Sequence, residues 1–405
     1  MKRRFLELFI LVLAVGGWYA ASQFYSFAAL GRMTMSKLNT VMFRESAAVS
    51  SPSASNAVPA DPKTRVLIVP GHEPDYGGAQ FGNIDERNLV AEIGGDLEQF
   101  LLSDNRYQVF ITRDAQAWNP IFADYFSKNW ASIVSWEQAS KKNGSRLAVI
   151  GSNGPVVKHH GTPTDVALRL YGITKWANEN NIDLMIHLHL NDYPGHSSAR
   201  AGKYSGLVIY TPADQYNNGS KTEAVAKAVF KRLSLYNPID NLPVESRGII
   251  DDPELIAVGA NNTADAASML IEYDYIYEPQ FVNPAVRSLA LKDLAYQTYL
   301  GLDDYFNRGA STTVTYDPKI LYDWRNPVSG KNANPEDIYA LQTALIMDGD
   351  YPPSGKSKND CPHSGTFGAC TAAALSAFQR RNGITDEGIG GVKTFELLRK
   401  IYQGI

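Results

Sequence analysis

Residues 66–90, VLIVPGHEPDYGGAQFGNIDERNLV, predict a buried strand, a glycine-rich turn and an amphipathic helix. Four consecutive apolar residues end at a Pro-Gly pair, as in a strand that is covered on both faces, and the chain then carries His72 into the turn. Apolar residues at helical spacing predict the helix over residues 84–102, which places Glu86 in its first turn. Zinc accepts histidine nitrogen and carboxylate oxygen, so His72 and Glu86 are two candidate metal ligands.

Strands and helices alternate after this stretch, which is typical of a largely parallel sheet with helices on both faces. We therefore expect an α/β domain over residues 64–310, built on a twisted, mostly parallel sheet. The segment 118–163 is extra to the alternation and is predicted to be either a lid over the site or an element that packs on the domain wall. The predicted strands are 65–70, 107–112, 182–190, 205–211 and 267–273, and the predicted helices are 84–102, 120–141, 164–180, 219–235 and 284–306.

A third metal ligand is expected from the strand at residues 182–190. Period-two alternation places His187 and His189 on one face of this strand, close to its carboxyl end, so either histidine is a candidate. The other histidines lie in predicted loops, where a solvated side chain is more common than a ligand: His159, His160, His196 and His363.

Glu272 is the candidate general base. It directly follows the apolar run Met269-Leu270-Ile271, where a buried carboxylate needs a partner such as a metal ion or its water. The alternative is a glutamate that faces solvent from an edge strand.

Five ordered motifs resemble the zinc-dependent N-acetylmuramoyl-L-alanine amidases of the amidase type 3 family. They are P-G-H at 70–72, D-E-R-N-L at 85–89, T-R-D at 112–114, I-H-L-H-L-N at 186–191 and L-I-E-Y at 270–273. The resemblance implies Zn²⁺ bound by His72, Glu86 and His189, with Glu272 as the catalytic residue. It also implies hydrolysis of the amide between N-acetylmuramic acid and the L-alanine of the stem peptide.

Two residues depart from the motifs of that family. Glu73 follows P-G-H where glycine is common, and His187 occupies the serine position of the S-I-H-x-N motif. The spacing to Asn191 favours His189 as the ligand.

The C-terminal residues 335–405 resemble a small three-helix peptidoglycan-binding domain, most specifically in F-Q-R-R-N-G at 378–383. A hinge or linker is expected over residues 311–334. The only two cysteines, Cys361 and Cys370, are predicted to form a disulfide because an exported chain meets oxidising conditions.

The N-terminus predicts export. Basic residues precede an apolar run within residues 1–30, as in a signal peptide or a membrane anchor, and a Ser/Ala/Pro-rich linker follows over residues 31–63. We expect a periplasmic or cell-wall location, with membrane contact only through this segment.

Composition restricts the partners. A net charge of −4 gives no electrostatic reason to expect nucleic acid, so peptidoglycan is the expected partner of a monomeric protein. Two alternatives to an amidase are a zinc peptidase that acts on stem-peptide bonds and a non-catalytic wall-binding or activator protein.

Overall fold

The structure is a computed structural model that describes most of the chain from residue 63 onward. The described residues are 63–146, 163–213, 217–258, 263, 265–306, 321–324, 327–329, 333–385 and 388–402. The predicted export segment and the linker that follows it, apart from its last residue, lie outside these residues. Within the described part of the chain, no helix is long and apolar enough to cross a membrane.

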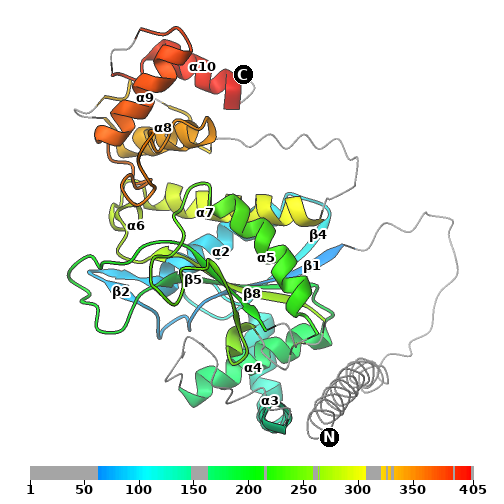
Figure 1. Cartoon of the computed structure of the whole chain (residues 1–405). Coiled ribbons are helices and arrows are strands. Elements are labelled where there is room, and N and C mark those ends of the chain that lie inside the picture. The colour runs from blue at the N-terminus through cyan, green and yellow to red at the C-terminus, as the bar shows by residue number, and fades with distance from the viewer. Residues whose placement is uncertain are drawn as a thin grey trace, which may run out of the picture. The chain divides into compact units, whose positions relative to one another are not determined.

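A six-stranded sheet forms the centre of the catalytic region (Figure 1). Its strand order is β4-β1-β5-β8-β6-β7, and every neighbouring pair is parallel except β6 and β8. The strands are β1 (Thr64–Pro70), β4 (Tyr107–Ile111), β5 (Leu184–Asn191), β6 (Val208–Pro212), β7 (Ile249–Asp252) and β8 (Ala267–Tyr275). The predicted class, a mostly parallel α/β sheet, is confirmed.

Helices cover both faces of the sheet, and strand alternation decides which side chain meets which helix. Val66 and Ile68 of β1 point into one core with helices α2 (Glu86–Leu102), α5 (Gly219–Leu233) and α7 (Arg287–Phe306). Leu67 and Val69 point into the opposite core with α3 (Pro120–Arg146) and α4 (Thr164–Glu179). Burial on both sides explains why β1 is a continuous apolar run.

Helix α3 packs on the domain wall, which favours the second interpretation of segment 118–163. Phe122 and Phe126 are buried against α4 and the sheet. They are therefore unavailable to cover a substrate groove, as a lid would require. Trp118, just before the helix, does line the functional pocket.

Several short elements were not predicted because each is too short for a periodic pattern. They are the two-strand ladder of β2 (Gln80–Phe81) and β3 (Ile84–Asp85), strand β7, the 3₁₀ helix η1 (Ile256–Val258) and helix α6 (Pro279–Val282). The segment that contains strand β7 and η1 forms one wall of a pocket beside the sheet.

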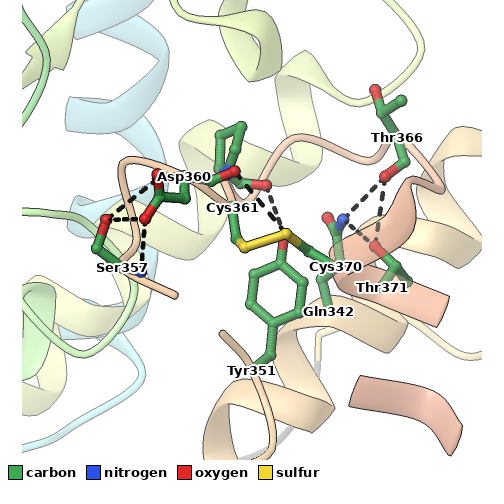
Figure 2. Close-up of a disulfide and its surroundings, with 9 residues drawn as sticks. Gln342, Tyr351, Ser357, Asp360, Cys361, Thr366, Cys370 and Thr371 are labelled. Carbon is green, nitrogen blue, oxygen red and sulfur yellow. Dashed lines mark hydrogen bonds between the residues drawn. A yellow bond between two sulfur atoms is a disulfide. The ribbon is translucent and has the colours of Figure 1, made fainter. Parts of the chain in front are cut away.

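The C-terminal region contains three helices with their own apolar core, as predicted. The helices are α8 (Pro335–Met347), α9 (Ala369–Arg381) and α10 (Val392–Tyr402). The predicted disulfide between Cys361 and Cys370 is confirmed, and it joins the loop after α8 to the first turn of α9 (Figure 2). Gln342 of α8 donates to the carbonyl of Thr366 and to the hydroxyl of Thr371, which ties the same loop to both helices.

Candidate metal centre

His72 lies in the turn directly after β1 and has a left-handed backbone, with φ of 67°. This conformation is uncommon for a residue with a side chain, so the surrounding structure must hold it. The holding group is Arg113, which is fully buried and donates to the carbonyl oxygens of Pro70, Gly71 and His72. It also donates to the carbonyl of Arg87 in α2 at 3.0 Å. One guanidinium therefore joins the loop that bears His72 to the helix that bears Glu86.

Arg113 belongs to the T-R-D motif, but sequence reasoning assigned it no role. Burial lowers its pKa to about 10, and the negative charges of Glu73 and Glu86 partly oppose this shift. Its contacts with backbone carbonyls could not be predicted, because they leave no pattern in the sequence beyond the position of Arg113 in the motif.

Glu86 occupies the start of α2 and is almost completely buried. Its Oε2 accepts a hydrogen bond from the backbone N–H of Ala79 at 2.7 Å, and its Oε1 accepts one from Leu190 at 3.1 Å. Oε1 also lies 2.9 Å from Nε2 of His72 and 3.0 Å from Nδ1 of His189. Burial alone would raise the pKa of Glu86, but the two histidines outweigh burial and hold the carboxyl well below its usual pKa.

His72, Glu86 and His189 can each offer a ligand atom, and these atoms lie within 4.8 Å of one another. Two imidazole nitrogens and one carboxylate oxygen are a donor set of catalytic zinc sites. Nε2 of His72 is buried without a hydrogen-bond partner of acceptable geometry among the described residues, as a nitrogen reserved for a metal ion would be. The three residues therefore fit Zn²⁺.

His187 and His189 share a face of β5 but lie at different depths. His189 is level with Glu272 of β8, whereas His187 is level with Val69 of β1 and Leu270 of β8, one repeat further from the strand end. A side chain at Gly71 would clash with the His189 ring, so glycine is required beside this candidate ligand. Burial lowers the pKa of His187 to about 3 and keeps its imidazole neutral.

Glu272 faces the same pocket beside His189. Its Oε2 is buried and has no hydrogen-bond partner among the described residues. Burial, followed by the charges of Glu86, Glu245 and Asp240, raises the pKa of Glu272 well above its usual value. A carboxylate that is buried without a partner and has a raised pKa is suited to accept a proton near neutral pH.

A buried pair of carboxyl groups, Asp240 and Glu245, lies behind Glu272 and was not predicted. Asn191 at the end of β5 donates to Glu245 at 2.6 Å and to Asp240 at 3.2 Å. Tyr210 of β6 donates to Glu245 at 2.7 Å. Burial raises the pKa of Asp240 to about 8, and so does the hydrogen bond that its protonated form donates to Glu245. Both carboxyl groups come from a Pro- and Asn-containing loop that resembles an ordinary solvent-exposed turn in sequence.

The metal centre opens into a pocket of about 1070 Å³ between the sheet, α4 and the segment around η1. Glu73, which stands where glycine is common in the family motif, lies at the edge of this pocket. Its buried carboxylate pairs with Arg169 of α4 at 3.1 Å. Burial raises the pKa of Glu73, and Arg169 opposes that shift. The extra charge is therefore neutralised by a partner on α4.

The remaining histidines are not brought to this centre where the structure describes them. His196 pairs with Asp192 at 2.9 Å and its ring contacts Tyr193 and Tyr277. His363 is buried in the C-terminal region against Tyr339. His159 and His160 lie outside the described residues.

Comparisons with known proteins assign both regions to families. Residues 66–304 match the N-acetylmuramoyl-L-alanine amidase family, and residues 334–398 match a putative peptidoglycan binding domain. No curated protein sequence matches the chain.

Several solved amidases resemble the chain at low identity. The CwlD amidase of Clostridioides difficile, solved in complex with the GerS lipoprotein, is 14% identical with a TM-score of 0.41 and covers 61% of this chain and 100% of its own. An amidase of Nostoc punctiforme is 18% identical, with a TM-score of 0.37 and coverage of 62% and 100%. One of Mycobacterium smegmatis is 12% identical, with a TM-score of 0.40 and coverage of 60% and 97%. The family match over residues 66–304 spans more than half of the sequence, and on that ground the chain belongs to the N-acetylmuramoyl-L-alanine amidase family.

Proposed function

We propose that the protein is an exported, zinc-dependent amidase that cleaves the bond between N-acetylmuramic acid and the L-alanine of the stem peptide. The observation that carries this proposal is the placement of Glu272 level with His189, beside the cluster of His72 and Glu86, in one pocket. Membership of the amidase family supports the substrate class.

His72, Glu86 and His189 would hold the metal ion. Zinc, when bound, makes water more acidic and polarises a carbonyl oxygen. The Ala79 and Leu190 amides fix both oxygens of Glu86, so this ligand is oriented before a metal arrives. Arg113 keeps His72 turned toward Glu86 through the backbone.

Glu272 would act as general base and then as general acid. It takes a proton from the attacking water and returns it to the amide nitrogen as the bond to the lactyl carbonyl breaks. The raised pKa of Glu272 suits both steps. A carboxylate with a raised pKa is a stronger base toward water, and its protonated form can still give the proton to an amine, which is more basic.

The C-terminal helices would hold the enzyme on its polymeric substrate, as the match to a peptidoglycan-binding domain suggests. Residues 1–30 would export the chain as a signal peptide or keep it at the membrane as an anchor, and we propose that it acts there as a monomer.

Digestion of purified muropeptides by the zinc-loaded full chain tests the proposal. Release of intact stem peptides with a free L-alanine amine is the expected result. Shortened stems still attached to the sugar would instead indicate a peptidase, and no product from a zinc-loaded, folded protein would indicate a wall-binding role. The Glu272→Gln variant is the matched control for contaminating hydrolases.

A further inference from the structure

The floor of the pocket is a row of four side chains on adjacent strands. Val69 of β1, His187 of β5, Leu270 of β8 and Tyr210 of β6 are in register across the sheet and all line the pocket. Each is at most 3% exposed, so this row is a buried surface of the cavity. The row lies two residues below His189 and Glu272, which is about 7 Å along the strands.

Among the four described residues of this row, His187 carries a buried polar atom that has no hydrogen-bond partner. It is 2% exposed, and its Nε2 has no hydrogen-bond partner among the described residues. A buried polar atom without a partner is costly, and one that lines a cavity is explained if a ligand supplies the missing hydrogen bond. Serine stands here in the related S-I-H-x-N motif, so the longer imidazole is a feature of this chain.

The surroundings of His187 suit an uncharged group. Val69 and Leu270 flank it on the sheet. Ile173 of α4 belongs to the same apolar cluster as Val69, Ala257 of η1 belongs to the same cluster as Leu270, and both line the pocket. Arg169 is the only arginine or lysine among the described residues that line the pocket, and it is already paired with Glu73 at 3.1 Å, so no free side-chain cation is available to neutralise an anion beside His187. The recess therefore matches a small group that has a methyl surface and one amide.

We propose that this recess receives the acetamido group of the N-acetylmuramoyl residue, and that Nε2 of His187 hydrogen-bonds to its amide. The inference rests on the proposed amidase function. The acetamido group and the lactyl ether leave neighbouring carbons of one sugar ring, so the two carbonyl groups are about 5–7 Å apart at bond lengths near 1.5 Å. That distance matches the offset between the His189 level and the His187 level.

One other pendant group of the substrate lies at a comparable distance, on the peptide side. It is the α-carboxyl group of the second stem residue, or its carboxamide when amidated. A carboxylate would be buried beside His187 without a cation, and a carboxamide has no methyl group to meet the apolar wall. The acetamido group satisfies both features of the recess.

The test uses the zinc-loaded full chain and three muramoyl dipeptides. One is N-acetylmuramoyl-L-alanyl-D-isoglutamine, the second lacks the N-acetyl group, and the third carries D-isoglutamate. Wild-type kcat/KM should fall by about 10²-fold or more for the substrate that lacks the acetyl group, because the methyl contact and the amide are lost together. It should change little between isoglutamine and isoglutamate.

Variants of His187 test whether this residue binds the acetamido group. His187→Leu should lower kcat/KM about tenfold for the acetylated substrate and leave the deacetylated one nearly unchanged, and His187→Gln should recover part of the loss. Zinc content is measured in each variant, since His187 is two residues from His189. Saturation-transfer NMR of N-acetylmuramic acid on the wild-type protein needs no variant, and the acetyl methyl protons should receive the strongest transfer.

Three outcomes would overturn the assignment. The first is equal cleavage of the acetylated and deacetylated substrates by the wild-type protein. The second is an equal loss of kcat/KM on both substrates in His187→Leu at normal zinc content. The third is a His187-dependent choice between isoglutamine and isoglutamate, which would mean that the recess binds the peptide. Failure to cleave any of the three substrates with zinc bound would instead reject the proposed function.

Discussion

The two carboxylates of the metal centre should respond in opposite ways to substitution. Glu86→Ala removes a proposed zinc ligand, and it also removes the acceptor of the Ala79 and Leu190 amides. Glu272→Gln keeps size and polarity, but the amide cannot accept a proton from water.

The structure sets the expected magnitudes. Leaving the buried N–H of Leu190 without an acceptor costs about 1–3 kcal/mol, and the half-buried N–H of Ala79 costs less because water can reach it. Glu86→Ala should therefore lower the free energy of unfolding of the zinc-free protein by about 1–3 kcal/mol. Glu272 has no hydrogen bond to lose at its buried Oε2, and a neutral amide relieves repulsion from Glu86 and Glu245. Glu272→Gln should therefore not be less stable, while its turnover falls by about 10² to 10⁴.

Three measurements on each variant separate these effects: bound zinc by mass spectrometry, thermal unfolding with and without chelator, and release of stem peptides from muropeptides. Glu92→Gln is the matched control, because this carboxylate is exposed on the same helix as Glu86. The reasoning is refuted if Glu272→Gln keeps near-normal turnover. It is also refuted if that variant loses zinc as Glu86→Ala does, which would make Glu272 a ligand.

Four further predictions concern residues away from the reacting atoms. Arg113→Lys should weaken zinc binding about 10- to 100-fold in chelator competition, because a lysine cannot donate to all the carbonyls that orient His72; unchanged affinity would contradict this. Replacing both Cys361 and Cys370 by serine should destabilise the C-terminal helices by about 2–3 kcal/mol in thermal unfolding, since the disulfide closes a short loop. Burial lowers the pKa of His363 to about 4 from 6.5, so the folded state binds fewer protons than the unfolded state between these values. The contribution of neutral His363 to the free energy of unfolding is complete above about pH 6.5 and falls by about 3 kcal/mol as the pH drops toward 4. His363→Gln should remove that part of the pH dependence of unfolding. Deleting residues 335–405 should reduce adhesion to insoluble wall in a sedimentation assay while turnover of soluble muropeptides stays largely intact, and an equal loss on both would contradict a tethering role.

Local pattern was sufficient to predict the centre of the fold. The run VLIV is buried on both faces as β1, and the helical spacing after the glycine turn places Glu86 at the start of α2. His72, Glu86 and Glu272 were proposed from their positions at element ends, and the structure brings all three to one pocket. Their chemical roles remain predictions.

The sequence pattern could not predict how far each side chain lies from the end of its strand, or which residues distant in sequence come into contact. Alternation assigns His187 and His189 to one face, but only the register with β1 and β8 shows that one lies at the metal level and the other at the pocket floor. Asp240 and Glu245 reach the site because the loop after α5 folds back onto Asn191 and Tyr210. No local pattern encodes such a contact.

The left-handed backbone of His72 has a consequence for engineering. A histidine in this conformation costs of the order of 1–2 kcal/mol relative to glycine, which adopts it freely. A thermostability screen run without zinc should therefore enrich glycine at position 72 and discard the proposed ligand. If His72 holds zinc, the same screen with zinc present should retain histidine, because the energy of metal binding then exceeds the backbone strain. On the proposed ligand set, resistance to heat and retention of the metal are competing goals at this one residue.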